Sequence, residues 1–317
     1  MQKWRTVVVG SRRVPVALAS ALVAGALTSG PTLAGATSSR VVDAPAPLHS
    51  FTSNAHVAWR GVGRPVHGQR AVYVTSLAMP DGRDRFAGIA WMNTHLLAAR
   101  LYSGSLSPGG VSWHYSAPIS NAAARTLVAA FNGGFLMKDS HGGYLSEGRL
   151  VAPLRAGAAS LVIYANGNAT VGQWGRDLTM SRSVVAVRQN LTLLVDHGRP
   201  VPGLRANDVL AWGMSLHQVV NDWRSGLGVT ASGDLVYVAG PLNIIDLAHT
   251  LVRAGAIRAM VLDMNPLWTV FATYSPATPR ALAAPSNGTT LLASMYQTPG
   301  RFFEPTYSRD FVTMSAR

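Results

Sequence analysis

The sequence predicts an α+β fold: one compact domain around a mixed, mostly antiparallel sheet with few helices. Three observations predict it. The strand-like segments are short, turn signals typical of β-hairpins recur between them, and only one segment has a clear helical period. With 48% hydrophobic and 13% charged residues, the chain of 317 residues can bury a sizeable core.

The first 36 residues are predicted to be a signal peptide. Basic residues from Lys3 to Arg13 precede an apolar run at 14–27, and small residues then end at Ala34-Gly35-Ala36. The apolar run is shorter than the roughly 20 residues of a membrane span. We therefore expect a bacterial protein that is secreted or held in the cell envelope, with no stable span in the mature chain. An uncleaved anchor is the alternative.

The mature chain is expected to begin with an arm and continue as one domain. Residues 37–68 contain Pro45 and Pro47 and show little periodicity, which predicts a linker or extended arm. Residues 69–317 show no linker composition and are expected to fold together. Strands are expected at 71–74 and 86–92.

The next segments predict a helix or strand and then two hairpins. Residues 121–130 have helical spacing, although 128–131 fit the start of a strand equally well. Asn166-Gly167 separates the apolar runs 160–164 and 169–171, a good hairpin signal. Ser232-Gly233-Asp234 separates 226–230 from 235–238 in the same way.

The clearest helix is expected at residues 244–254. Leu247 and Leu251 fall on one face, Asn243 can cap its start, and Gly255 stands where a C-terminal glycine belongs. Short strands are expected at 191–195 before it and at 259–262 after it.

Composition excludes several classes of chemistry. The absence of cysteine excludes disulfides, cysteine nucleophiles and thiolate zinc sites. No HExxH, P-loop, GxGxxG or GxSxG pattern occurs. No cofactor is therefore predicted, and a divalent cation stays open without a sequence signature. The net charge of +13 suits an anionic partner such as a phosphorylated glycan, but a merely basic secreted protein fits equally. The arginines are scattered, so we predict no nucleic-acid partner.

Two glycine-rich segments are candidates for the site. In Asn132-Gly133-Gly134, paired glycines let the backbone approach a ligand, and the amide of Asn132 offers donors and an acceptor to sugar hydroxyls. A tight turn without a ligand is the alternative. Glu147 is one of only two glutamates and lies in a second glycine-rich loop, where an exposed turn residue is the alternative.

Two later segments add charge. The planar fork of Arg224 could grip a phosphate, or it could pair structurally with an acid. Asp263 ends a buried strand, a position suited to lining a pocket, although a cap or turn aspartate is equally consistent. Met264-Asn265-Pro266 follows it.

In combination and order, these segments resemble the phosphodiester glycosidase family over roughly residues 125 to 275. The matching motifs are Asn-Gly-Gly-x-Phe, here ending at Phe135 without the spacer, an Arg-Ser-x-x-Gly block beginning at Arg224, and Leu262-Asp263 at a strand end. The family usually continues this Leu-Asp with a run of glycines and a serine. Met264-Asn265-Pro266 stands there instead, which indicates a divergent bacterial branch.

The resemblance implies hydrolysis of a glycosyl-1-phosphodiester bond in an envelope or extracellular glycan. Glu147 and Asp263 would be the catalytic carboxylates, with acid and base unassigned. Arg224 would bind substrate by neutralising the phosphate, and Asn132, Gly133, Gly134 and Asn265 would contact the substrate as well. Because Asn132, Glu147, Arg224 and Asp263 each stand at a strand end or in a glycine-rich loop, these four are expected to line one cavity. The alternatives are a non-catalytic envelope protein that binds glycan or serves as a scaffold, and a binder of anionic polymers.

Overall fold

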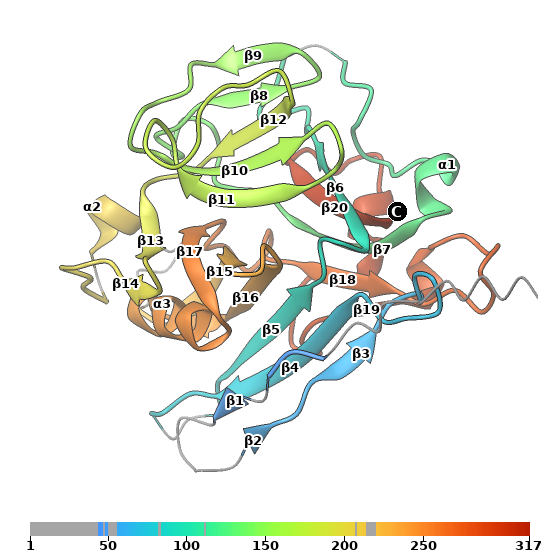
Figure 1. The fold of residues 1–317 in the computed structure, drawn as a ribbon, viewed down its shortest axis with the longest axis horizontal. Helices are drawn as coiled ribbons and strands as arrows, with labels where there is room; N and C mark the ends of the chain where they lie inside the picture. The colour runs from blue at the N-terminus through green and yellow to red at the C-terminus, as the bar shows by residue number, and fades with distance from the viewer. Residues whose placement is uncertain are drawn as a thin grey trace, which may run out of the picture. The chain divides into compact units, whose positions relative to one another are not determined.

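In the part of the chain that the structure describes, every pair of neighbouring strands is antiparallel, and the strands form four sheets (Figure 1). The computed structural model describes residues 44–46, 48–49, 56–81, 84–110, 112–206, 208–213 and 220–317. They belong to one compact unit, Arg40–Arg317. The predicted α+β class with a mostly antiparallel arrangement and few helices is confirmed. The predicted signal peptide lies outside the described residues.

The largest sheet has eight strands in the order β14-β13-β17-β15-β16-β5-β4-β3. The predicted hairpin at Ser232-Gly233 joins β15 to β16, and Gly233 adopts the positive φ of 87° that such a turn requires. β3 pairs with β4, so the part of the expected arm from Arg60 onward belongs to this sheet. The strands are β3 Arg60–Val62, β4 Val72–Ala78, β5 Phe86–Met92, β13 Leu193–Asp196, β14 Arg199–Pro200, β15 Asp222–Thr230, β16 Leu235–Leu242 and β17 Ala256–Val261.

A five-stranded sheet with the order β11-β10-β12-β8-β9 forms the second layer. The predicted Asn166-Gly167 hairpin joins β10 to β11. A turn at Glu147 and Gly148 joins β8 to β9. The strands are β8 Tyr144–Ser146, β9 Arg149–Ala152, β10 Ala159–Tyr164, β11 Ala169–Gln173 and β12 Val184–Gln189.

A third sheet, with the order β19-β18-β7-β20-β6, brings the C-terminal strand beside the strand that carries Asn132. A two-stranded pair, β1 with β2, completes the set. The strands are β6 Leu97–Tyr102, β7 Leu127–Asn132, β18 Phe271–Tyr274, β19 Gly288–Thr290, β20 Phe311–Ala316, β1 Leu48–His49 and β2 His56–Val57.

The helices are few and short. The predicted helix is α3, Ile244–Arg253, and the side chain of Asn243 caps it by accepting a hydrogen bond from the N–H of Asp246 at 2.9 Å. Helix α1 spans only Asn121–Ala124, because the next residues enter β7 between β18 and β20. The others are α2 Val209–Trp212 and the 3-10 turns Pro285–Asn287 and Pro299–Phe303. None of the helices in these described ranges has the length and hydropathy to span a membrane.

Two hydrophobic layers pack on opposite faces of the largest sheet. Leu227 and Val229 of β15 join the cluster that contains Phe131 of β7, whereas a Cβ added at Gly226 would meet Leu251 of α3. Side chains alternate along a strand. Odd-numbered residues near the start of β15 therefore face β7, and even-numbered ones face α3, which decides where Ser225 and Arg224 point.

Candidate active site

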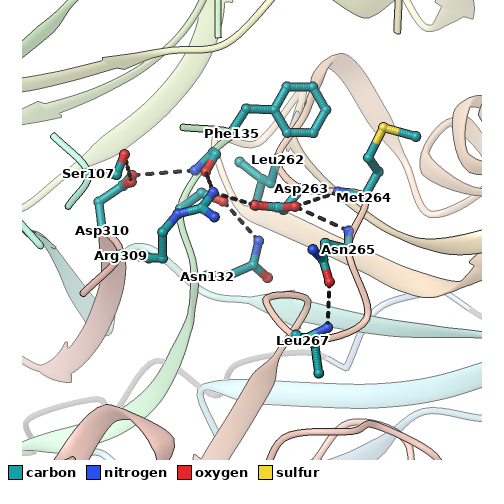
Figure 2. A network of polar contacts seen from close by, with 12 residues as sticks. Ser107, Asn132, Phe135, Leu262, Asp263, Met264, Asn265, Leu267, Arg309 and Asp310 are labelled. Atoms are coloured by element: carbon teal, nitrogen blue, oxygen red, sulfur yellow. Dashed lines mark hydrogen bonds and ion pairs between the residues drawn. The ribbon is translucent and has the colours of Figure 1, made fainter. Parts of the chain in front are cut away.

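The carboxylate of Asp263 lies just beyond β17 in a network of buried polar groups (Figure 2). Its Oδ2 accepts a hydrogen bond from Nη2 of Arg309 at 2.7 Å. Its Oδ1 accepts from the main-chain N–H groups of Met264 at 2.8 Å and Asn265 at 3.2 Å. Asp263 is 4% exposed and Arg309 is 6% exposed. The two side chains form a buried ion pair.

Ser225 fixes the main chain of Asp263. The N–H of Ser225 donates to the carbonyl of Asp263 at 2.7 Å, and the N–H of Asp263 donates to Oγ of Ser225 at 3.2 Å. The pairing of β15 with β17 is thus continued beyond the end of β17. The main chain of Asp263 is thus held just beyond the end of β17 by bonds that do not involve its carboxylate.

Burial raises the pKa of Asp263 to about 6 from the ordinary 3.8. Arg309 and the main-chain N–H groups of Met264 and Asn265 oppose this rise, and the charge of nearby Asp310 adds to it. A carboxyl group with this pKa gains and loses its proton near neutral pH. Such a group is suited to general acid or base catalysis.

Asn132, at the end of β7, joins three segments. Its Nδ2 donates to the carbonyl of Gly133 at 2.8 Å and to Oγ of Ser225 at 3.0 Å. Its Oδ1 accepts from the hydroxyl of Tyr237 at 2.7 Å and from the N–H of Val270 at 3.1 Å. Two donors and two acceptor positions are the whole capacity of an amide. Asn132 therefore has no hydrogen bond left for a sugar, and it holds Ser225, which in turn holds Asp263.

Gly133 and Gly134 make room for a second buried ion pair. A Cβ on Gly133 would lie 2.0 Å from Oδ2 of Asp310, and one on Gly134 would lie 2.9 Å from Nη2 of Arg188. Asp310 accepts from Nε of Arg188 at 2.8 Å and from the N–H of Gly134 at 3.4 Å. It also accepts from the hydroxyl of Ser107 at 3.1 Å (Figure 2). The paired glycines are required by packing against these charged groups.

Two groups beside Asp263 keep capacity for a ligand. Oδ1 of Asn265 accepts from the N–H of Leu267 at 2.9 Å (Figure 2), and its Nδ2 donates to no group in the described part of the chain. Arg309 makes both of its hydrogen bonds through Nη2, to Asp263 and to the carbonyl of Gly134. Its buried Nε has no partner within the described ranges. A buried donor without a partner is costly, so it marks a place where a polar ligand or water would bind.

Arg224 lies on the other face of β15. Its Nη1 donates to the carbonyls of Leu242 at 2.6 Å and Val220 at 3.1 Å, while the adjacent Ser225 contacts Asn132. Burial lowers the pKa of Arg224, and nearby Asp222 opposes this effect. The expected grouping of Arg224 with Asn132 and Asp263 is therefore not found, because consecutive residues of a strand point to opposite faces.

Glu147 lies in the β8–β9 turn and contacts a different part of the chain. It adopts a positive φ of 51°, and its carboxylate accepts from the main-chain N–H groups of Tyr115 at 2.8 Å and His114 at 3.0 Å. Glu147 makes no hydrogen bond or ion pair with Asp263 or Arg309. The structure thus brings together Asn132, the two glycines, Asp263 and Asn265, and it places Glu147 and Arg224 elsewhere.

No sequence motif predicted that Arg309, Asp310 or Arg188 would belong to the site. Arg309 and Asp310 directly precede β20, and Arg188 lies on β12, so all three come from segments without a ligand-binding motif. Arg309 and Asp310 are adjacent and precede an apolar segment, in a chain with few acidic residues. That pair was the one sequence feature that could have indicated a role in the site. Within the described ranges, no three His, Cys, Asp or Glu side chains gather as metal ligands would.

Residues 125–263 match the phosphodiester glycosidase family. The matched segment begins before Asn132 and ends at Asp263, so it includes the hydrogen-bonded core of the site but not Arg309. The match indicates a hydrolase of the glycosidase type with a sugar-derived substrate. No curated protein matches the chain.

Three of the solved structures that align with this chain are the following. A zebrafish N-acetylglucosamine-1-phosphodiester alpha-N-acetylglucosaminidase catalytic domain, auto-inhibited by its pro-peptide, aligns with 13% identity and a TM-score of 0.47, over 87% of this chain and 96% of that chain. A hypothetical protein from Synechocystis aligns with 12% identity and a TM-score of 0.41, over 82% and 68% of the two chains. A putative exported protein from Burkholderia pseudomallei aligns with 14% identity and a TM-score of 0.38, over 73% and 74%. The family match confirms the resemblance that the motifs indicated: over residues 125–263, this chain is similar to the phosphodiester glycosidases.

Proposed function

We propose that this protein is an exported hydrolase that cleaves a glycosyl-1-phosphodiester bond, with Asp263 as its catalytic base. The observation that carries the proposal is the buried Asp263 carboxyl, with a pKa of about 6 and Arg309 beside it at 2.7 Å, at the end of the family-matched segment. A base of this pKa is mostly ionised at neutral pH and still strong enough to take a proton from attacking water.

One positioned carboxylate is sufficient for this reaction. Water attacks the anomeric carbon, the bond from that carbon to the phosphate oxygen breaks, and the phosphate monoester leaves with the electron pair. Asp263 takes the proton of the water. A phosphate monoester is a weakly basic leaving group, so it needs less proton donation than an alkoxide. Glu147 has no catalytic role in this proposal, since main-chain N–H groups occupy both of its oxygens.

Arg309 takes the phosphate-binding role that the sequence suggested for Arg224. Its Nε is buried without a partner among the described residues, and it stands beside the proposed base. A guanidinium group stabilises charge that grows on the leaving phosphate. Nδ2 of Asn265, which has no partner among the described residues, is the side-chain donor proposed for a sugar hydroxyl. Asn132, Gly133 and Gly134 act as positioning residues, since they hold Ser225 and make room for Asp310.

Export and an envelope or extracellular glycan substrate rest on the amino-terminal sequence pattern. Basic, apolar and small-residue segments follow one another in residues 1–36, and the net charge of +13 suits an acidic glycan. The check is amino-terminal sequencing of the native protein. A first residue near Thr37 in the extracellular fraction supports export, whereas a retained Met1 in the cytoplasmic fraction contradicts it.

A non-catalytic glycan-binding protein is the second candidate. The observation that favours it is the sequence Met264-Asn265-Pro266 where the family has glycines, because a stiffer loop narrows the approach to Asp263. This protein would bind glycans and hydrolyse none.

The deciding experiment is a hydrolysis screen with purified mature protein on glycosyl-1-phosphodiesters and on alkyl glycosides of the same sugars. Cleavage of phosphodiesters only is expected. Asp263→Asn should lower kcat by about 100-fold or more, as expected for the loss of a positioned base. Arg224→Gln is the matched control for a buried arginine outside the site and should change kcat less than about 3-fold. Failure of the wild-type protein on every phosphodiester, with glycan binding retained, would favour the second candidate.

A further inference from the structure

A large cavity lies apart from the Asp263 site, between the second and third sheets. Its volume is about 1040 Å³, slightly above the range of roughly 300–1,000 Å³ typical of small-molecule sites. Residues of β6, β8, β12, β20, α1 and the β10–β11 hairpin line it, and Figure 1 shows the second sheet next to β6 and β20. Asn132, Asp263 and Arg309 are not among its lining residues. We call it the side cavity.

The side chains of β6 and β20 alternate between the hydrophobic core and the side cavity, and those that face the cavity include polar groups. On β6, Leu101 belongs to the main hydrophobic cluster, so Arg100 points to the opposite face. On β20, Val312 and Met314 belong to that cluster, and Thr313 lines the cavity. Arg100 and Thr313 are direct cross-strand partners, so a guanidinium group and a hydroxyl lie side by side.

Several polar side chains on this lining have no protein partner. Thr313 and Ser146 are each 2% exposed, and their hydroxyls make no hydrogen bond with the described residues. The guanidinium of Arg100 makes no hydrogen bond or ion pair within the same ranges and only stacks on the ring of Tyr115, with Cζ 4.0 Å from the ring centroid. The guanidinium of Arg100 is exposed, and the hydroxyls of Thr313 and Ser146 are not among the fully buried atoms without a partner. All three groups can therefore meet a ligand or water in the side cavity.

The remaining lining determines the class of ligand. Glu147 contributes the one carboxylate among the lining residues, and it faces the same cavity as Arg100, so the two charges offset each other. Tyr115 and Tyr164 add aromatic surface. Hydroxyls, one guanidinium donor group and aromatic rings are groups that recognise sugars, which present hydroxyls on their edges and apolar C–H groups on their faces.

We propose that the side cavity binds a neutral oligosaccharide, independently of hydrolysis at Asp263. Glu147 is then a positioning residue, because its bonds to the N–H groups of His114 and Tyr115 hold the segment that carries the Tyr115 ring. An anionic polymer is disfavoured, since Glu147 would repel it.

The test measures binding to the catalytically disabled full-length mature protein, Asp263→Asn. Calorimetric titration uses neutral trisaccharides to hexasaccharides of the glucan, mannan, chitin and galactan series, and one sulfated oligosaccharide as the anionic comparison. At least one neutral series should bind. Arg100→Gln should weaken that binding by about 10-fold, and Thr313→Val by about 5-fold, as expected for lost hydrogen bonds from a charged and a neutral donor.

Two matched controls lie outside the cavity. Arg199→Gln on β14 and Thr170→Val on β11 should leave binding unchanged. Because Thr313 is buried, thermal unfolding must first show that Thr313→Val is folded. If it is not folded, binding to Arg100→Gln still tests the proposal, because Arg100 is exposed. The proposal is overturned if no neutral series binds, if the sulfated compound binds best, or if Arg100→Gln has no effect. The binding experiment measures no hydrolysis. Its result therefore does not depend on whether the phosphodiester assay succeeds or fails.

Discussion

The unusual pKa of Asp263 predicts how the stability of the folded protein depends on pH. The pKa is about 6 in the folded protein and close to 3.8 in an unfolded chain. Between these values the folded state binds more protons than the unfolded state, so the free energy of unfolding falls as the pH rises. The gap corresponds to about 3 kcal/mol at about 1.4 kcal/mol per pKa unit. This penalty is absent below about pH 4 and complete above about pH 7.

Asp263→Asn isolates this contribution because the amide does not titrate. Urea unfolding of wild-type protein and variant, followed by tryptophan fluorescence at several pH values, gives the difference between their free energies of unfolding. Groups that do not interact with Asp263 titrate equally in both proteins and cancel. The difference, wild type minus variant, should fall by about 3 kcal/mol between about pH 4 and pH 7. A difference that stays constant or rises with pH would refute the raised pKa.

Three further predictions concern the site. The kcat/KM for a phosphodiester should rise with pH through an apparent pKa near that of Asp263, about 6, in a stopped assay across that range; a decline over the same range contradicts a base. Asn132→Asp should lower the free energy of unfolding by about 2–4 kcal/mol in urea unfolding, because a carboxylate cannot donate to Ser225 and the Gly133 carbonyl; a loss below about 1 kcal/mol contradicts the joining role. Gly133→Ala should cost about 3 kcal/mol by the same measurement, since its Cβ would lie 2.0 Å from Oδ2 of Asp310; an unchanged midpoint argues against that close contact.

Local sequence signals predicted the elements that depend on local chemistry. The Asn166-Gly167 hairpin and the α3 cap at Asn243 each follow from a few adjacent residues, and both are found. The helical spacing that begins at Asn121 did not continue past Ala124. Burial of the following residues between β18 and β20 outweighs helix propensity there.

The grouping of the site residues depended on information that motifs do not carry. Arg224 and Ser225 stand side by side in one motif, but only the face on which each lies decides which reaches Asn132. Strand alternation predicts that Arg224 and Ser225 lie on opposite faces of β15. Because both faces of β15 are buried, the sequence pattern does not show which face lies toward Asn132. Arg309 comes to Asp263 through the pairing of β20 with β7, a contact between strands far apart in the sequence. Long-range pairing of this kind leaves no local signal.

The proposed chemistry requires that water attack the sugar and not the phosphorus. Hydrolysis of a glycosyl-1-phosphodiester in water enriched in ¹⁸O, followed by mass spectrometry of both products, identifies the bond that breaks. We expect ¹⁸O in the anomeric hydroxyl of the released sugar and none in the phosphate monoester, with the label lost together with activity in Asp263→Asn. Label in the phosphate would mean cleavage of the P–O bond and would contradict a glycosidase with Asp263 as its base.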